Sequence, residues 1–338
     1  MIRAGIAPLS TLILVAAAMA ASVPAPAAAQ AFVPAQGEGT VSVLFQDQFY
    51  KYHVIPTVES QGLIYSDSLL LDVSYGLTDK IAVGFGLPWI ATRYAGSNPH
   101  LLPDLSGPNP IDNGSWHAAV QDIRIDFRYN VTRNFANAGI VVTPFVGSVT
   151  PSHDYTYFAH AGFGRDLNEV QMGASVAKLF EKGIPGLIIQ GRYAYGFVQQ
   201  VVDISHNRSL MSLEAAYFLT PKLRLMALSS GEITHGGIDF YGPVVSRALL
   251  TPDEFNHHDQ IIRENMLTLG GGASFSLTES WDVFGSFMHT VAQRNGHVLD
   301  RGITAGVSWS FTTSRAKKSA GTMAENSLAR CVCEKGKK

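Results

Sequence analysis

This chain of 338 residues carries little charge, because Lys, Arg, Asp and Glu together make up only 15% of it. Soluble domains usually contain about 25% of these residues. Beyond the N-terminal segment, no run approaches the roughly 18 consecutive apolar residues that a transmembrane helix needs. An ordinary soluble domain and a helical membrane protein are therefore both poor interpretations of this composition.

Cysteine is nearly absent as well. The chain has two, Cys331 and Cys333, and both lie close to the C-terminus. The body of the chain therefore has no disulfide framework of the kind that stabilises small secreted domains. A Cys-x-Cys pair is too close in sequence to brace a fold, so we expect it to be incidental. A soft-metal ligand and an exposed thiol pair are the alternatives.

Basic residues are scarce in the body of the chain. The segment after Phe311 holds seven of the 25 Lys and Arg residues, and Arg3 is another, which leaves 17 cations against 25 acidic residues over 30–311. No basic stripe and no aromatic stacking platform accompanies them. Nucleic acid is therefore not an expected partner.

The N-terminus has the features of an export signal. Arg3 supplies a positive charge, residues 6–19 an apolar stretch, and residues 27–29 a run of alanine, which is typical of a cleavage site. We expect a signal peptide over 1–29, cleaved near Ala29. The full chain is rich in Gly (32), Phe (18) and Tyr (12), a composition that in an exported protein favours a β-barrel in a Gram-negative outer membrane.

The clearest alternation of side chains runs through 122–130. The residues at odd positions are apolar, namely Ile123, Ile125, Phe127 and Tyr129. The residues at even positions are polar, and most are charged. Alternate residues of a strand point to opposite faces, so this segment predicts a strand with one face toward lipid and one toward a polar lumen. The same alternation recurs in segments that begin near residues 68, 81, 187, 211 and 303.

Four short turns share one motif: an aromatic residue, any residue, an aliphatic residue, Thr, and two mostly polar residues. They begin at Tyr75, Tyr129, Tyr217 and Phe275. Longer segments separate them, at 54–65, 95–118, 150–165, 200–209, 236–262 and 294–299. Short turns at one end and long loops at the other are typical of outer-membrane barrels. We expect the short turns to face the periplasm and 236–262 to be the longest outer loop.

These patterns predict an all-β fold, a transmembrane antiparallel up-and-down β-barrel over residues 30–311. We expect about twelve strands, near 40–53, 66–76, 81–94, 119–131, 138–149, 166–179, 187–200, 209–219, 222–234, 263–277, 281–293 and 300–311. Phe311 ends the last strand with alternating aromatics, the usual form of an assembly signal. Expected partners are therefore the outer-membrane assembly machinery, membrane lipid and lipopolysaccharide. Residues 312–338 predict a disordered basic tail.

Eight charged residues fall on the expected lumen faces, and we call them the charge band. They are Asp72, Asp122, Arg124, Asp126, Arg128, Arg192, Glu214 and Arg224. Ion pairs between strands, such as Arg192 with Glu214, would brace the interior, whereas a charged constriction would select solutes. Eight strands leave a filled interior and 16–18 an open channel, so twelve are compatible with a narrow pore or a plugged lumen.

Catalytic or metal chemistry has few candidates. The run His257-His258-Asp259 could bind zinc or copper, but its spacing matches no standard site, and we expect no metal and no cofactor. A lipid hydrolase would need Ser and His together on the lipid-facing wall. His289 and Ser286 lie on opposite faces of their strand, although a serine from a neighbouring strand stays open. We therefore predict no catalytic residues and no enzyme.

Several segments carry a family resemblance. They are Tyr-Gly-Leu-Thr-Asp-Lys at 75–80, Gly-Leu-Pro-Trp at 86–89, Asp-Ile-Arg at 122–124 leading to Arg128 and Tyr129, Val-Thr-Pro-Ser-His-Asp at 149–154 and Gly-Arg-Tyr at 191–193. Over roughly residues 40–311, the chain resembles outer-membrane proteins of the MetA-pathway of phenol degradation type, often labelled transporters. The resemblance implies passive passage of small molecules, including aromatic or hydrophobic ones. Two features depart from the family: Ser152-His153 replaces Thr-Gly, and a tail follows Phe311.

Overall fold

The computed structural model describes residues 31–54, 58–59, 62–97, 99–100, 102, 106–132, 139–239 and 251–313. The expected signal peptide (1–29) and most of the expected tail, with Cys331 and Cys333, lie outside these residues and stay predictions. In the described part of the chain, no helix is long and apolar enough to span a bilayer.

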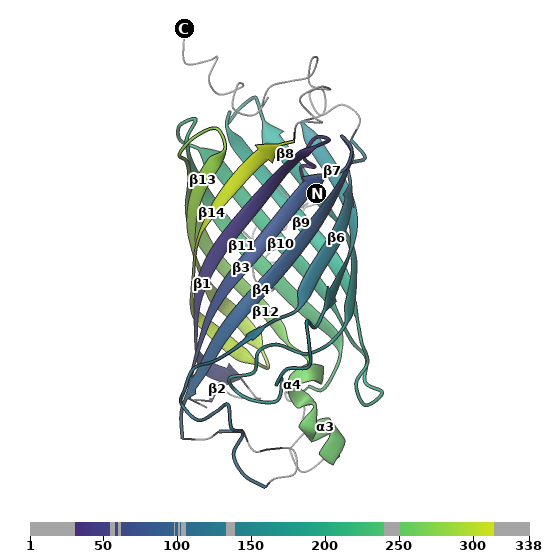
Figure 1. Ribbon diagram of the computed structural model, residues 1–338, viewed down its shortest axis with the longest axis vertical. Helices are drawn as coiled ribbons and strands as arrows, with labels where there is room; N and C mark the ends of the chain where they lie inside the picture. The colour runs from purple at the N-terminus through teal and green to yellow at the C-terminus, as the bar shows by residue number, and fades with distance from the viewer. Residues whose placement is uncertain are drawn as a thin grey trace, which may run out of the picture.

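The described strands close into one antiparallel barrel (Figure 1). Its wall is formed by β1 (Glu38–Val54), β3 (Leu63–Gly76), β4 (Ile81–Ala95), β6 (Ile123–Tyr129), β7 (Ile140–Thr150), β8 (Glu169–Phe180), β9 (Leu187–Val198), β10 (His206–Phe218), β11 (Leu223–Gly236), β12 (Asn265–Ser276), β13 (Trp281–Arg294) and β14 (His297–Thr312). Neighbours in sequence pair with each other, and β1 also pairs with β14. The predicted twelve-stranded up-and-down barrel is confirmed.

Two short strands complete the sheet. β2 (Val58–Glu59) pairs with the end of β1. β5 (His117–Val120) pairs with β4 and precedes β6, so the strand expected over 119–131 is interrupted at 121–122. At the interruption, the N–H of Gln121 still donates to the carbonyl of Pro88, at 2.9 Å.

Two segments expected to be long loops are tight hairpins, which corrects the sequence-based prediction. Val202 and Asp203 have φ of 44° and 60°, and Asn295 and Gly296 have φ of 56° and 78°. Positive φ at both central residues defines the two-residue turn that matches strand twist, and Asn-Gly is its strongest sequence signal. The long connections that remain are those after β1, β4, β7 and β11.

The described parts of the long connections lie at one end of the barrel, which we call the long-loop end (Figure 1). The helices α3 (Pro252–Asn256) and α4 (His258–Ile261) lie there. The opposite, short-turn end carries the repeated motif. In three of its turns the Thr side chain accepts backbone N–H groups two and three residues ahead, at Thr78, Thr220 and Thr278. These bonds explain why Thr recurs at that place.

The strand faces follow the predicted alternation. In β6, Ile125 and Phe127 are 39% and 52% exposed, while Arg128 on the other face is 8% exposed. Exposed large apolar side chains recur around the outer wall, as Leu69, Met172, Phe197, Leu213 and Phe287 illustrate. An apolar outer surface with charges turned inward is the arrangement that suits a lipid-embedded wall.

This facing makes a testable prediction. Replacing Ile125 by Arg places a cation on the lipid face, and we expect a loss of about 2–4 kcal/mol of folding free energy near the bilayer midplane. The matched change Gln171→Arg adds the same cation on the lumen face beside Glu169 and should cost much less. Denaturant titration of both variants in lipid vesicles measures the two costs, and equal costs would contradict the facing.

Candidate functional site

The loop after β7 folds back into the barrel at the long-loop end. Ala161 packs against Ile64 and Tyr94, and Tyr155 and Phe163 pack against Ile90. These wall residues are buried and lie on the lumen faces of β3 and β4. The loop therefore occupies part of the lumen rather than extending away from the barrel.

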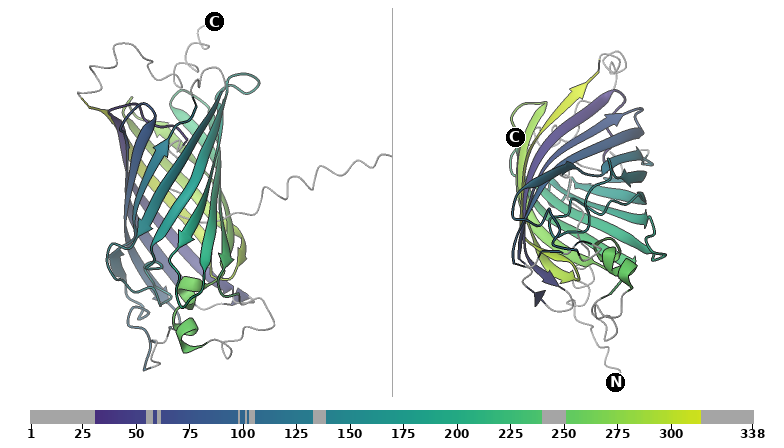
Figure 2. Two further views of the ribbon diagram at one scale, coloured as in Figure 1. Left: turned by 90° about the vertical axis from the view of Figure 1, so that its right-hand side faces the viewer. Right: turned by 60° about the horizontal axis from the view of Figure 1, so that its bottom comes forward.

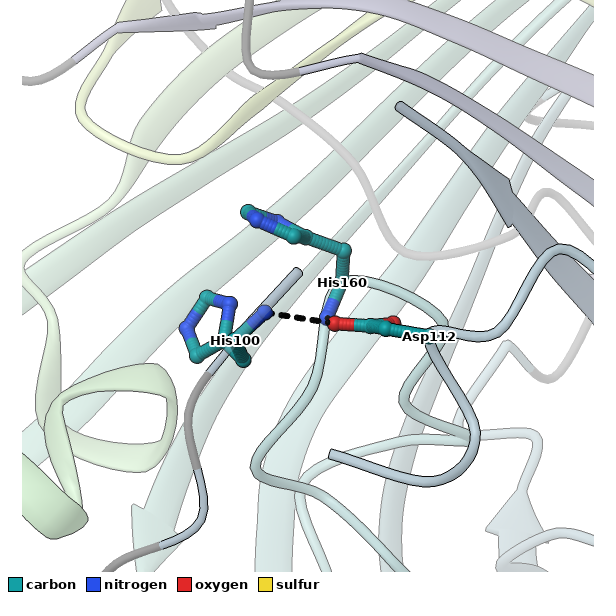
Figure 3. A group of neighbouring side chains, drawn as sticks. All are labelled: His100, Asp112 and His160. Atoms are coloured by element: carbon teal, nitrogen blue, oxygen red, sulfur yellow. Dashed lines mark hydrogen bonds between the residues drawn. The ribbon is translucent and has the colours of Figure 1, made fainter. Parts of the chain in front are cut away.

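One carboxylate ties this loop to the loop after β4. Asp112 accepts the backbone N–H groups of His100 and His160 through Oδ2, at 2.9 and 3.1 Å, and that of Ala161 through Oδ1, at 2.9 Å. Figure 3 shows the carboxylate at the backbone of both histidines, with both rings turned away from it. Three charge-assisted bonds from one buried carboxylate hold the two loops together.

The connection between β11 and β12 covers the same end (Figure 2). Its helix α3 starts with a capping box, in which Thr251 and Glu254 exchange side-chain and backbone hydrogen bonds, a strong local signal for a helix start. Gln260 of α4 then donates to the carbonyl of Arg165, at 2.7 Å. We call the described parts of these three loops, 99–112, 153–167 and 251–263, the loop plug.

Beneath the loop plug lies a network of buried ions, which we call the ion network. Arg208 contacts Glu169 at 2.5 Å and Glu232 at 3.2 Å, and Arg165 contacts Glu232 at 3.1 Å and Glu264 at 3.5 Å. Glu169 and Glu232 have side chains only 3% exposed. Burial, and then the neighbouring Glu232, raise the pKa of Glu264. Three carboxylates thus share two guanidinium groups at a poorly hydrated level of the lumen.

The sequence did not indicate the ion network. Glu232 shares the parity of Arg224, which is the one signal that could have placed it in the lumen. Arg208 and Arg165 fell in expected loops, and Glu264 lay at the start of an expected strand, 263–277, whose bounds were uncertain. Glu169, Arg208 and Glu232 lie at the same height in the barrel only because of where β8, β10 and β11 begin and end.

The charge band is present on the lumen side, but the structure divides it. One part follows β3 and β6. Arg128 contacts Asp126 at 2.8 Å and donates to the hydroxyl of Ser74 at 2.7 Å, reaching across β4. A Cβ on Gly84 would lie 2.3 Å from the Asp126 carboxylate, so glycine at this position leaves room for the pair. Asp72 and Arg124 flank Gly86 in the same way.

The other members of the charge band lie on β9, β10 and β11. Glu214 accepts a hydrogen bond from Gln190 at 3.0 Å and contacts Arg224 at 3.9 Å. Arg192 instead lies over the ring of Phe145, 3.5 Å from its centre, a cation–π contact. The expected pair of Arg192 with Glu214 is therefore wrong, because Arg192 stands opposite Ser212 in the strand register.

Asp122 links the charge band to the loop plug. It lies at the break between β5 and β6 and accepts a hydrogen bond from the hydroxyl of Tyr155. Burial, together with the nearby Asp122 carboxylate, raises the pKa of Tyr155 above its usual range. The hydroxyl therefore stays protonated and keeps donating to Asp122. A movement of the loop plug would therefore displace Asp122 or break the hydrogen bond that it accepts from Tyr155.

Residues 31–37, just before β1, lie inside the barrel at the short-turn end. Ala31 is fully buried against Val141 and Ala177, and its carbonyl accepts a hydrogen bond from the hydroxyl of Thr143 at 2.6 Å. Gly37 donates to the carbonyl of Gly76 at 2.9 Å. The expected barrel segment 30–311 thus begins with an inward segment, and its first strand starts at Glu38.

A serine and a histidine meet on the outer wall, where a lipid hydrolase would need them. The Ser209 hydroxyl lies 2.8 Å from Nε2 of His235, and the Tyr193 hydroxyl lies 3.2 Å from Ser209. Ser209 is 4% exposed. A catalytic triad also needs a group that orients the histidine, and in the described part of the chain no carboxylate is hydrogen-bonded to His235. In the described residues, Ser209 and His235 therefore form a pair without the third member of a triad.

Comparisons with known proteins agree on the fold. No family model and no curated protein matches the sequence. The structure of an outer-membrane channel from Pseudomonas putida is similar to this chain, with a TM-score of 0.62 and 13% sequence identity. The match covers 84% of this chain and 98% of the channel's chain. The NanC porin covers 80% of this chain and 98% of its own, with a TM-score of 0.47 and 10% identity. The fold shared with the Pseudomonas putida channel is an outer-membrane β-barrel, and the finer family resemblance stays a prediction.

The ion network makes a prediction about stability. Replacing Arg208 by Met leaves Glu169 and Glu232 buried beside a single guanidinium, and we expect a cost of about 3–5 kcal/mol. Arg224→Met breaks only the longer contact with Glu214 and should cost clearly less. Unfolding titrations of both variants in the same detergent or lipid give the comparison. A smaller cost for Arg208→Met than for Arg224→Met would show that the ion network is not needed for stability.

Proposed function

We propose that this protein is a passive channel for small solutes in a Gram-negative outer membrane, with the loop plug as its gate. The short turns face the periplasm and the loop plug faces the outside, in contact with lipopolysaccharide. The observation that carries the proposal is the lumen wall, where polar and charged groups remain partly hydrated. The side chain of Asp126 is 30% exposed although it points into the barrel.

Small residues along the lumen wall support passage. At Gly84 and Gly86 of β4, a larger side chain would fill the space beside the charge band. Beside them, Leu44, Leu70, Asp72, Pro88 and Arg124 line a cavity with room for about one water molecule. A wall that combines apolar groups with paired charges suits small amphipathic or aromatic solutes, because they can contact both. The fold shared with the Pseudomonas putida channel is consistent with this role.

The tightest passage lies at the loop plug and ion network in this proposal. Three loops meet at this level, and the side chains of Glu169 and Glu232 are only 3% exposed there. Charges in a poorly hydrated place interact more strongly than the same charges in open water. A solute must therefore displace the loop plug before it reaches the charge band.

A second candidate is a surface-binding barrel whose lumen stays closed. It is favoured by the segments at both ends, the loop plug at one and residues 31–37 at the other. In that case the outer loops would contact a partner and no solute would cross. The two candidates differ in a single measurable property, passage through the barrel.

Loosening the loop plug tests the gate. Asp112→Ala removes the acceptor of three backbone N–H groups, each bond to a charged group being worth about 1.5–3 kcal/mol. We expect a higher single-channel conductance in planar bilayers and faster swelling of liposomes with small sugars. Asp154→Ala removes an exposed carboxylate of the loop plug itself, away from the Asp112 contacts, and should change neither. If the native protein and Asp112→Ala both fail to conduct, the closed surface-binding barrel is supported instead.

The charge band should set ion preference once the plug has opened. Arg128→Ala and Arg192→Ala each remove a cation from the lumen, so we expect the reversal potential in a salt gradient to shift toward cation selectivity. Lys182→Ala removes an exposed cation from the β8–β9 turn and serves as the control. Unchanged potentials in both arginine variants of a conducting channel would mean that the charge band only braces the wall.

A further inference from the structure

Three side chains that could bind a metal ion meet inside the loop plug, and we call them the histidine cluster. His100 comes from the loop after β4, and His258 and Asp259 come from α4. His100 and His258 are 158 residues apart in sequence. No spacing motif could have joined them, which is why the sequence predicted no metal site.

The nearest atoms of the three side chains of the histidine cluster lie within 3.5 Å of one another in a triangle, and its two sides to Asp259 end on different carboxylate oxygens. Nε2 of His100 lies 3.5 Å from Nε2 of His258. Asp259 lies 3.5 Å from Nε2 of His100 through Oδ2, and 3.2 Å from Nε2 of His258 through Oδ1. Ligands held at about 2.0–2.1 Å from zinc at the tetrahedral angle stand about 3.3–3.4 Å apart. The two ring nitrogens therefore have close to the spacing of two zinc ligands, and the Asp259 carboxylate lies at a similar distance from each of them.

The surroundings orient the ring of His258 as a metal ligand is oriented. Nδ1 of His258 lies 2.6 Å from the carbonyl of Phe255, so a proton on Nδ1 leaves a lone pair on Nε2, which faces the cluster. A hydrogen bond on the far ring nitrogen is the usual support for a metal-bound histidine. Phe158 packs edge-on against the rings of both His100 and His258 and supplies an apolar wall.

The cluster is largely buried, with one more open side. His258 is 7% exposed, and the side chains of His100 and Asp259 are 11% and 21% exposed. A water molecule can complete a tetrahedron on the side of Asp259. Asp112 is near but is committed to three backbone N–H groups, so it positions the backbone of His100 and is not a ligand.

We propose that His100, His258 and Asp259 bind one divalent transition-metal ion, with zinc as the best match to the triangle. Two imidazoles and a carboxylate are a donor set that zinc uses in proteins. The ion would link the loop after β4 to α4 and so hold the loop plug closed. Binding itself does not depend on the proposed channel, whereas the effect on passage does.

The test is a zinc titration of the full mature chain, refolded in detergent, by calorimetry. We expect one zinc per barrel, and an affinity about tenfold or more weaker in His100→Ala, His258→Ala and Asp259→Asn, since even supporting residues of metal sites cost that much. His257→Ala is the matched control. Its ring is adjacent in sequence but contacts Tyr157 and Gln260, so its affinity should be unchanged.

Two further readouts separate the possible outcomes. Cobalt added in place of zinc should give the intense visible absorption of a tetrahedral site in the native chain and in His257→Ala, and lose it in His100→Ala. Zinc should also lower the conductance of a channel that conducts. A barrel that folds, as shown by its heat-modifiable gel mobility, but binds zinc no better than His100→Ala would overturn the site. Zinc binding without any conductance would support the site and count against the channel.

Discussion

In the core of a bilayer, a backbone N–H or C=O group has no water to bond with, so every strand edge must be paired. The pairing of β1 with β14, from Glu38 opposite Thr312 to His53 opposite His297, meets that constraint. Closure then forces every second side chain into a confined lumen. The ion network, the charge band and the Gly positions on β4 follow from it, because inward charges must find partners across neighbouring strands.

Charges line the lumen at two levels, and their pairing connects the structure to the proposed function. In the charge band, Asp126 is 30% exposed and pairs with the buried Arg128, whereas the carboxylates of Glu169 and Glu232 lie under the loop plug and are 3% exposed. Buried ions of this kind are tolerated only when they are well paired. The ion network therefore fixes the wall on which the loop plug sits, and Tyr155 connects that plug to Asp122.

Polar contacts join the loops of the loop plug to one another. Asp112 collects three backbone N–H groups from two loops, and Gln260 joins α4 to Arg165. Contacts of this type are strong in a buried place but depend on a single group each, which makes the plug suited to opening as a unit. A metal ion at the histidine cluster would add one more contact of this type, between the loop after β4 and α4.

The sequence by itself determined the barrel, the strand count, the facing of β6 and the Thr-containing turns, because alternation and turn chemistry are local properties of the backbone. It also placed Asp126, Arg128, Glu214 and Arg224 on the lumen side. The tertiary structure alone decided which charges meet, and it placed Arg192 over the ring of Phe145 and not beside Glu214. It also turned residues 31–37 inward. It also brought together Arg208 with Glu232 and His100 with His258, since such contacts depend on strand register and on loop paths that no local pattern encodes.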